Sequence, residues 1–470
     1  MVGLSLGASL TTSAVPVMHD GPVAAWDFSE PGAPYVDHQN GHALAVAAGA
    51  TAPLRKPDGF RPGIASLAFD GTDQHLVIAE NALGRLQMGG AATQVTVAAW
   101  VKRTGDTNAA IAGIWPEAVQ DPQRQYALFV NLALYGGDDR VCGHVSGDGQ
   151  VTPGYPYMRD YAWNARRIAP DGSDGWRFAV FTYDGAAIRS YLDGGFEAVP
   201  SYTDIEGQTG PANPRPYSAG LNPSPAEFTV GAVRLSGGYG NFLKGEIAGL
   251  RVWDRALSQT EIRALFLAER PATQPLFHDD FRTGVKVASR ALGWRSFQGS
   301  TGTETTDLVP GDPVPEVYNF AGSGAGHGGY LARSASAVGI GAAVYDGFQN
   351  APLRFQDAAS ITWLMNNSAP SCAVRVLLRI SGKWVASEAT FSCSAAHTAQ
   401  DWTGAEPFSL ALARTASQWR RVTLEAGVAL SLGAPVSSDI AGNTLEAFGF
   451  LCDNTQPGTV RIDALRLTAR

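Results

Sequence analysis

The sequence lacks the features that connect proteins to nucleic acids or to membranes. Its Lys and Arg residues form no cluster, and its formal net charge at pH 7 is -8. A nucleic acid or an anionic membrane surface would therefore be repelled. The chain also has no run of 18 or more apolar residues, so no membrane-spanning helix is predicted. We expect neither a nucleic acid nor a membrane as partner.

Several motifs of common enzyme classes are also missing. The sequence contains no H-E-x-x-H, no P-loop, no G-x-S-x-G and no G-x-G-x-x-G between a strand and a helix. Its four cysteines show neither C-x-x-C nor zinc-site spacing. Zinc proteases, P-loop enzymes, α/β-hydrolases and dinucleotide-dependent enzymes are therefore disfavoured.

Turn-forming residues, in contrast, are abundant. The 470 residues include 54 Gly and 28 Pro, which separate short alternating segments such as 66–69, 96–101, 177–183 and 189–192. One helix is expected, because Ser258 and Glu261 form a capping box ahead of Ile262, Leu265 and Phe266 on one helix face. The turn residues and the short alternating segments predict an all-β protein, and the chain length predicts two tandem β-sandwiches.

The predicted boundaries follow from composition. Residues 1–20 are interpreted as the remnant of a leader or of cloning, 21–270 as the first sandwich, 271–276 as a Pro-containing linker, and 277–470 as the second sandwich. The apolar N-terminal stretch lacks a basic region, which suggests a trimmed signal peptide and a secreted or periplasmic protein. The oligomeric state is left open.

One cysteine pair has a geometric argument for a disulfide. Gly382 and Lys383 are interpreted as a two-residue hairpin turn of type II′, with Gly first. That register places Cys372 directly opposite Cys393, within the distance that a disulfide can bridge. Two buried free thiols are the equally weighted alternative, because a single bulge would break the register.

Six segments in the first half follow one another in a recognisable order. They are 23–30, 67–73, 95–101, 176–194, 228–232 and 245–262, which read VAAWDFSE, LAFDGTD, VTVAAWV, WRFAVFTYDGAAIRSYLDG, FTVGA and GEIAGLRVWDRALSQTEI. In this order they resemble the laminin-G-like, concanavalin A-like jelly-roll family of bacterial extracellular proteins. The resemblance implies a carbohydrate-related function, although a fold by itself defines none.

The second half resembles galactose-binding-like modules, the carbohydrate-binding sandwiches appended to polysaccharide-degrading enzymes. The resemblance lies in the opening FHDDF of 277–281 and the closing VRIDALRL of 460–467. It implies a structural calcium ion held by Asp280 and Asp463, with solvated aspartates at strand ends as the alternative. In the first sandwich, Asp27, Asp70 and Glu246 lie in segments that meet in the resembled fold, and we expect calcium there too.

The most unusual stretch is 142–167, where aromatic, charged and His side chains interrupt the strand rhythm. Aromatic rings stack on the apolar faces of sugars, and Arg, Asp and His bind hydroxyls and carboxylates. If 155–161 is a strand, its four odd-numbered residues share one face. Loops 217–225 and 237–241 are expected to line the same surface. The candidate ligand-binding residues are Tyr155, Asp160, Trp163, Asn222, Tyr239 and Asn241, and the candidate catalytic residues are His144, Tyr157, Arg159 and Tyr161.

Three functions remain open for this stretch. The leading one is an extracellular protein that binds a polysaccharide or oligosaccharide during polysaccharide degradation. A polysaccharide lyase would use a Tyr or His base and an Arg, all of which are present, but the R-x-E-L-R and Q-I-H signatures of alginate lyases are missing. A glycoside hydrolase is less favoured, because no E-x-D-x-E or E-x-D-x-x-E strand occurs. A non-catalytic adhesion protein, or packing of these residues at a sandwich edge, is the remaining interpretation.

Overall fold

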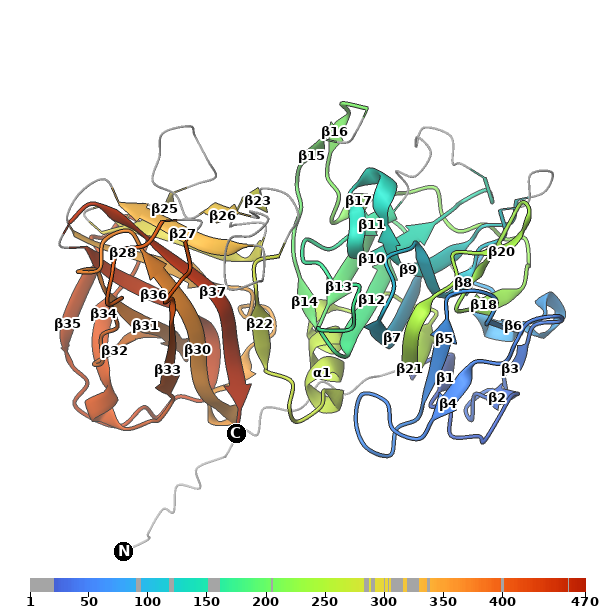
Figure 1. The fold of residues 1–470 in the computed structure, drawn as a ribbon, viewed down its shortest axis with the longest axis horizontal. Coiled ribbons are helices and arrows are strands. Elements are labelled where there is room, and N and C mark those ends of the chain that lie inside the picture. Colours follow the sequence, from blue (N-terminus) through green and yellow to red (C-terminus); the bar gives the residue numbers. More distant parts are fainter. Residues whose placement is uncertain are drawn as a thin grey trace, which may run out of the picture.

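The structure is a computed structural model, and it describes residues 21–89, 94–117, 122–150, 161–203, 206–282, 287–288, 292–299, 301–302, 304–305, 316–318, 329–335, 339–398, 401–454 and 456–470. Two β-sandwiches follow one another along the chain, blue to green and then yellow to red in Figure 1. The predicted all-β class with tandem sandwiches is confirmed. Among the described helices, none is long and apolar enough to cross a membrane.

The first sandwich consists of a nine-stranded and an eight-stranded sheet. The nine-stranded sheet has the order β14-β13-β12-β7-β21-β5-β4, with β1 paired to β21 and β17 paired to β13. Its strands are β1 (Ala24–Trp26), β4 (Leu54–Lys56), β5 (Ser66–Asp70), β7 (Val95–Arg103), β12 (Arg177–Tyr183), β13 (Ala187–Leu192), β14 (Gly195–Phe196), β17 (Arg215–Pro216) and β21 (Lys244–Trp253).

The eight-stranded sheet has the order β11-β10-β9-β8-β18-β6-β3-β2. Two small hairpins, β15–β16 and β19–β20, accompany it. The strands are β2 (Tyr35–Val36), β3 (Ala43–Val46), β6 (Leu76–Ile78), β8 (Ala109–Ile114), β9 (Tyr126–Leu132), β10 (Gly137–Val145), β11 (Tyr161–Trp163), β15 (Tyr202–Thr203), β16 (Thr209–Gly210), β18 (Phe228–Val230), β19 (Val233–Leu235) and β20 (Gly238–Gly240).

The second sandwich packs a seven-stranded sheet, β23-β26-β27-β37-β30-β33 with β22 on β37, against a nine-stranded sheet, β25-β24-β28-β36-β31-β32-β34-β35 with β29 on β36. Its strands are β22 (Phe277–Asp279), β23 (Val287–Ala288), β24 (Trp294–Gln298), β25 (Glu304–Thr305), β26 (Glu316–Tyr318), β27 (Tyr330–Ala335), β28 (Gly339–Tyr345), β29 (Leu353–Arg354), β30 (Ala358–Asn367), β31 (Ala373–Ile380), β32 (Lys383–Ser387), β33 (Glu406–Ala411), β34 (Trp419–Thr423), β35 (Ser431–Pro435), β36 (Thr444–Asn454) and β37 (Gly458–Ala469).

Side-chain alternation along β7 explains how one strand is buried on both faces. Val97 and Ala99 point into the core shared by the two sheets of the first sandwich, whereas Ala98 and Trp100 point to the opposite face. There they pack against helix α1 (Gln259–Glu269). The helix begins with the predicted capping box, because the Ser258 hydroxyl accepts a hydrogen bond from the Glu261 N–H.

Turn chemistry defines the hairpins of the first sandwich. Asp193 and Gly194 both have positive φ, 51° and 72°, as a type I′ turn requires, and they connect β13 to β14. At the preceding hairpin, the Asp184 carboxylate accepts hydrogen bonds from the N–H groups of Ala186 and Ala187. Both Asp-Gly dipeptides therefore form the turns of these hairpins.

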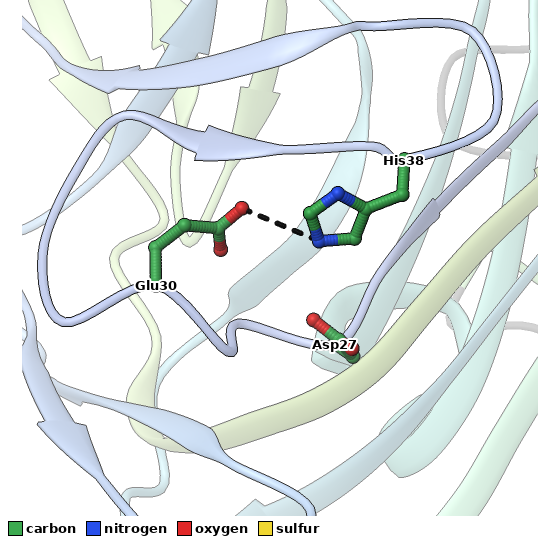
Figure 2. Close-up of side chains that lie close together, drawn as sticks. All are labelled: Asp27, Glu30 and His38. Atoms are coloured by element: carbon green, nitrogen blue, oxygen red, sulfur yellow. Dashed lines mark ion pairs between the residues drawn. The ribbon is translucent and has the colours of Figure 1, made fainter.

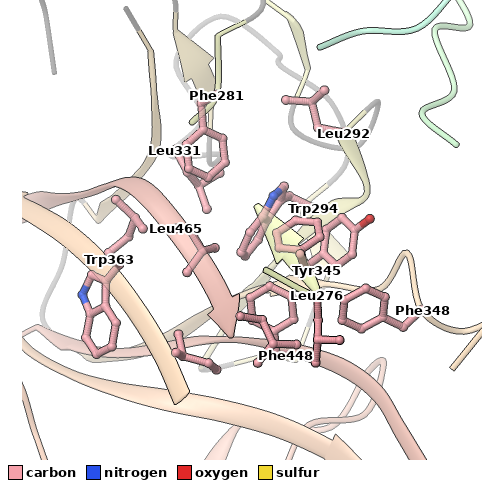
Figure 3. Packing of buried hydrophobic residues seen from close by; sticks show 14 of the residues in the cluster. Leu276, Phe281, Leu292, Trp294, Leu331, Tyr345, Phe348, Trp363, Phe448 and Leu465 are labelled. Atoms are coloured by element: carbon pink, nitrogen blue, oxygen red, sulfur yellow. The ribbon is translucent and has the colours of Figure 1, made fainter. Parts of the chain in front are cut away.

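The opening and closing strands of the second sandwich pair with each other. β22 lies antiparallel to β37, with Phe277 opposite Leu467. The core beside this pair is aromatic, and Figure 3 shows Trp294, Tyr345, Phe348 and Phe448 packed together. Burying such large rings contributes a major part of the free energy of folding.

A buried ion-pair group joins the two sandwiches. Arg166, in the segment after β11, pairs with Glu197, which follows β14, and with Asp279 of β22 at 2.7 Å. All three side chains are at most 7% exposed. The indole N–H of Trp294 donates to Asp279 at 3.2 Å. The guanidinium group therefore contacts one carboxylate from each sandwich.

A second chain of ion pairs crosses the same junction. Arg177 pairs with Asp193 at 2.7 Å and with Asp174 at 3.4 Å. Arg282 of the second sandwich reaches the other oxygen of Asp174 at 2.7 Å and pairs with Asp280 at 2.9 Å. Burial alone raises the pKa of Asp174, but the two neighbouring guanidinium groups hold that pKa below its ordinary value.

This arrangement predicts an acid-sensitive junction. Because the folded-state pKa of Asp174 is lowered, its contribution to stability is present above the unfolded pKa of about 3.9 and is lost as pH falls through the folded value. Asp174→Asn should cost about 1.5 to 3 kcal/mol at pH 7. Urea unfolding should show this difference shrinking towards pH 3, and a pH-independent difference would contradict the assignment.

Candidate functional site

The outer face of the eight-stranded sheet carries the predicted residues that the structure brings together. His144 of β10 is directly opposite Tyr161 of β11, and their rings lie 5.3 Å apart. In the neighbouring row, Cys142 is opposite Trp163. Phe129 of β9 extends this second row. We call these residues, together with Trp115, the outer aromatic face; each of them is buried, at most 8% exposed.

Trp115 completes the face from the segment that follows β8. Its indole ring lies 4.1 Å from the His144 ring and 5.9 Å from that of Phe129. The indole N–H donates to Glu117 at 2.9 Å, and the guanidinium group of Arg124 lies over the ring at 5.9 Å. A carboxylate and a guanidinium group therefore border an aromatic floor.

Hairpin β19–β20 borders this face as well. The N–H of Glu117 donates to the Arg234 carbonyl at 2.7 Å, which fixes the hairpin beside Trp115. Tyr239 of the hairpin donates its hydroxyl to Glu227 at 2.8 Å. Burial and the adjacent Glu227 raise the pKa of Tyr239 to about 12. The predicted residue Tyr239 therefore lies in this hairpin with its hydroxyl held by a carboxylate and its ring 4.0 Å from that of His75.

The opposite border is formed around Trp163. The guanidinium group of Arg140 lies 4.9 Å from the Trp163 ring, and Tyr202 meets that ring edge-on at 5.0 Å. Burial lowers the pKa of Arg140 to about 10. Its NH1 group donates to Asp138 at 2.8 Å, so the cation remains paired.

Four predicted residues, Tyr155, Tyr157, Arg159 and Asp160, lie outside the described residues. Their place in the chain is nevertheless informative. They belong to the connection between the end of β10 at Val145 and the start of β11 at Tyr161. Both ends of the connection are therefore fixed beside the His144–Tyr161 pair.

Two of the candidate loop residues have structural roles. The side-chain oxygen of Asn222 accepts a hydrogen bond from the Ser224 N–H, its carbonyl accepts one from Gln125, and the residue is 4% exposed. Asn241 adopts a left-handed conformation with φ of 52°. Its carbonyl accepts from the Ala110 N–H. These contacts explain both residues as turn formers rather than as ligand-binding groups.

Tyr161 has a packed hydroxyl. It donates to the carbonyl of Leu132 at 3.3 Å, and the residue is 3% exposed. A general base must reach a substrate proton. This geometry therefore assigns Tyr161 to the floor of the face rather than to proton transfer.

Near the N-terminal strand, three potential metal ligands approach one another. Asp27, Glu30 and His38 each have one potential ligand atom within 4.8 Å of the other two. The imidazole of His38 lies 3.6 Å from the Glu30 carboxylate, a contact drawn in Figure 2. No other such group of three was found among the described residues. Two carboxylates and an imidazole suit a divalent transition metal better than calcium, which prefers oxygen ligands.

The other carboxylates expected around calcium in the first sandwich have protein partners. Glu246 pairs with Lys56 at 2.8 Å and lies 3.8 Å from Lys102. Asp70 accepts a hydrogen bond from the Thr72 N–H in its turn at 2.8 Å. Neither residue joins Asp27 in a common ligand group within the described chain. This arrangement does not fit a calcium ion shared by the three.

In the second sandwich, Asp280 is paired with Arg282, and Asp463 lies inside β37 with one oxygen accepting the Ala464 N–H at 2.6 Å. A carboxylate already neutralised by an arginine is a poor calcium ligand. The calcium site expected from the resemblance stays a prediction.

The disulfide expected between Cys372 and Cys393 is wrong, since both thiols are free. Ser381 and Gly382, both with positive φ, form the turn, so Ile380 faces Lys383 and the register beside the turn differs by two residues from the predicted one. The predicted register returns at the bridge between Val374 and Phe391. The Cys372 thiol interacts with Cys452, which raises the pKa of Cys372. The Cys393 thiol is directed instead towards the Met365 carbonyl at 3.4 Å.

Sequence reasoning missed Trp115, Glu117, Arg124 and Arg140. The first three lie between β8 and β9, 18 to 27 residues before the stretch 142–167 that stood out by composition. The signal that could have revealed them is an aromatic residue and a carboxylate, Trp115 and Glu117, just after a fully buried strand.

One known protein family matches part of the chain. Residues 70–263 match a family model described as the concanavalin A-like lectin/glucanases superfamily. This confirms the resemblance for most of the first sandwich. The resemblance of residues 277–470 to galactose-binding-like modules stays a prediction. A search of curated protein sequences gave no significant match.

Solved structures give more distant similarities. Trypanosoma rangeli sialidase in complex with sialic acid is 17% identical, with 55% of this chain and 34% of the sialidase covered and a TM-score of 0.35. The chain thus spans about a third of the sialidase's length. The binding domain of botulinum neurotoxin DC in complex with rat synaptotagmin II is 9% identical over 94% of this chain and 98% of that domain, with a TM-score of 0.34.

A SAP-like pentraxin from Limulus polyphemus is 17% identical over 42% of this chain and 79% of its own, with a TM-score of 0.26. Such scores relate the chain to no particular one of these proteins. The family match is the more informative finding: residues 70–263 are similar to the concanavalin A-like lectin/glucanases superfamily.

Proposed function

We propose that the protein binds an oligosaccharide or polysaccharide at the outer aromatic face and the connection that joins β10 to β11. The observation that carries the proposal is the His144–Tyr161 cross-strand pair. It fixes both ends of the connection beside Trp115, so that Tyr157 and Arg159 belong to a segment anchored at an aromatic and charged border.

The chemistry of this border supports a sugar ligand. Guanidinium and carboxylate groups bind sugar hydroxyls, whereas the buried rings of Trp115 and Tyr161, 1% and 3% exposed, offer no face for stacking. Arg124 and Glu117 provide both kinds of polar group next to Trp115. The similarity of residues 70–263 to a superfamily named for lectins and glucanases supports the same ligand class.

Binding without cleavage is the favoured form of this function, in the setting of polysaccharide degradation. The Tyr161 hydroxyl is engaged with the Leu132 carbonyl, which removes one of the groups that a lyase would use as base. Binding requires only the charged border of Glu117 and Arg124 and the connection between β10 and β11.

A polysaccharide panel tests the proposal. The full chain is mixed with alginate, pectate, hyaluronan, laminarin and xylan, and the melting temperature, ultraviolet absorbance and reducing ends are measured. We expect at least one polysaccharide to raise the melting temperature without new absorbance or reducing ends. New ultraviolet absorbance would identify a lyase and new reducing ends a hydrolase. An unchanged melting temperature throughout the panel would contradict the binding proposal.

A further inference from the structure

Two of the four cysteines meet inside the second sandwich. Cys452 of β36 lies directly opposite Val374 of β31, and Cys372 precedes Val374 by two residues. Because side chains alternate along an extended chain, Cys372 and Cys452 point to the same face. Both belong to one buried cluster, and they are 3% and 1% exposed. The two thiols are therefore diagonal neighbours in the core.

A hydrogen bond joins the two sulfur atoms. It raises the pKa of Cys372 and lowers the pKa of Cys452, so the Cys372 S–H donates and the Cys452 sulfur accepts. The other two thiols, those of Cys142 and Cys393, donate to backbone carbonyls at 3.5 Å and 3.4 Å. Cys372 and Cys452 are thus the pair whose sulfur atoms already face each other.

A buried guanidinium group lies beside this pair. Arg333 of β27 is 7% exposed, and its Nε and Nη1 atoms are buried without a hydrogen-bond partner. The group lies against Gly341, which is directly opposite Cys452 and which has no room for a side chain there. In addition to the hydrogen bond from Cys372, this positive charge lowers the pKa of Cys452. Arg333 therefore favours the thiolate, the nucleophilic form of Cys452.

The backbone at Cys372 leaves room for a covalent bond. In a regular antiparallel ladder, the Cα atoms of a diagonal pair lie about 7 to 8 Å apart, whereas a disulfide spans about 4.4 to 6.8 Å. Cys372 precedes the first residue of β31, and its N–H closes a turn by donating to the Ala369 carbonyl at 3.2 Å. A shift of about 1 Å within this turn, outside the ladder, therefore brings the pair into disulfide range.

We propose that Cys372 and Cys452 form a disulfide when the chain folds in the presence of a thiol–disulfide oxidant, and that Cys142 and Cys393 stay reduced. The bond links β36 to the start of β31 inside the second sandwich. It is independent of the outer aromatic face, which lies on the first sandwich.

Glutathione disulfide is a sufficient oxidant for this step. The Cys452 thiolate attacks one of its sulfur atoms, so that one glutathione thiolate leaves and a mixed disulfide forms on Cys452. Cys372 then loses its proton and attacks the Cys452 sulfur, which expels the second glutathione thiolate. The protein loses two protons and two electrons, and the oxidant becomes two glutathione thiols. Because both cysteines are buried, this exchange takes place before the sandwich has closed.

Oxidative refolding of the full chain tests the proposal. The protein is unfolded and reduced in urea with dithiothreitol, refolded by dilution into a mixture of reduced and oxidised glutathione, and alkylated with iodoacetamide in urea. Mass spectrometry of a non-reduced digest then identifies the bridged and the alkylated cysteines. We expect one cross-linked peptide pair, which contains Cys372 and Cys452, and alkylated Cys142 and Cys393.

The melting temperature provides a second measurement. The bridge closes a loop of about 80 residues, so the oxidised chain should melt at least about 5 °C above the same chain after reduction. Cys372→Ser should abolish both the cross-linked peptide and this difference. Cys393→Ser, which removes another buried cysteine of the same sandwich, is the matched control and should retain both.

Three results would overturn the proposal: alkylation of both Cys372 and Cys452 after refolding, a bridge from Cys372 to Cys393, or an unchanged difference in melting temperature in Cys372→Ser. The peptide map of the unsubstituted chain decides the question even if Cys372→Ser does not fold.

Discussion

Replacing Arg166 by methionine is expected to lower the free energy of unfolding by about 3 to 5 kcal/mol. The substitution removes the guanidinium group between Glu197 and Asp279 and leaves two carboxylates without their counter-charge. Both carboxylates are at most 2% exposed, so water cannot replace the lost partner. The cost therefore comes from uncompensated burial of charge.

Urea unfolding of the full chain measures this cost, with Arg354→Met as the matched control. Arg354 is an exposed arginine paired with Asp357, and its loss should change stability by less than about 1 kcal/mol. Adding Glu197→Gln to Arg166→Met should recover part of the stability, because one buried charge disappears. If Arg166→Met behaves like the control, the junction does not depend on this ion-pair group.

Arg159→Ala is expected to weaken binding of an acidic oligosaccharide about ten- to hundredfold. A charge-assisted bidentate hydrogen bond to a carboxylate contributes about 1.5 to 3 kcal/mol. Each 1.4 kcal/mol corresponds to a factor of ten in affinity. Titration with the acidic polysaccharide that binds in the panel measures the change, and Arg354→Ala, on the second sandwich, provides the control. Equal affinities for Arg159→Ala and Arg354→Ala would remove Arg159 from the site.

Tyr157→Phe in the same titration separates binding from catalysis. The substitution keeps the ring and removes only the hydroxyl, so a binding protein should keep its affinity within a few-fold. A lyase that uses this hydroxyl would lose activity about 100-fold while retaining its substrate. If neither this variant nor Arg159→Ala changes binding, the connection has only a structural role.

Much of the fold is predictable from local turn and capping signals in the sequence. The Asp193-Gly194 turn and the Ser258 capping box are short-range features, and the structure has the capping box as predicted. The cysteine pair shows the limit of this reasoning. Taking the turn one residue late shifts the register by two only beside the turn, since Val374 pairs with Phe391 as that register requires. The sequence does not reveal that Cys372 and Cys393 face different strands.

The sequence reveals some of the residues of the candidate site, but it does not reveal how strand pairing brings the others beside them. His144, Tyr161 and Trp163 lie in one segment, and the structure places them on one face. Trp115 and Arg124 come from another segment and reach that face only through the pairing of β8, β9 and β10. Likewise, the lysine partners of Glu246 come from β4 and β7, and sequence alone does not reveal this proximity.

Hydrogen exchange of the full chain, with and without the polysaccharide that binds in the panel, tests the central proposal most directly. We expect bound ligand to slow exchange in peptides covering 115–124 and 144–167, which border the outer aromatic face, and to leave peptides of β30 and β36 unchanged. Slower exchange confined to the second sandwich, or no change in any peptide under saturating ligand, would contradict binding at this face.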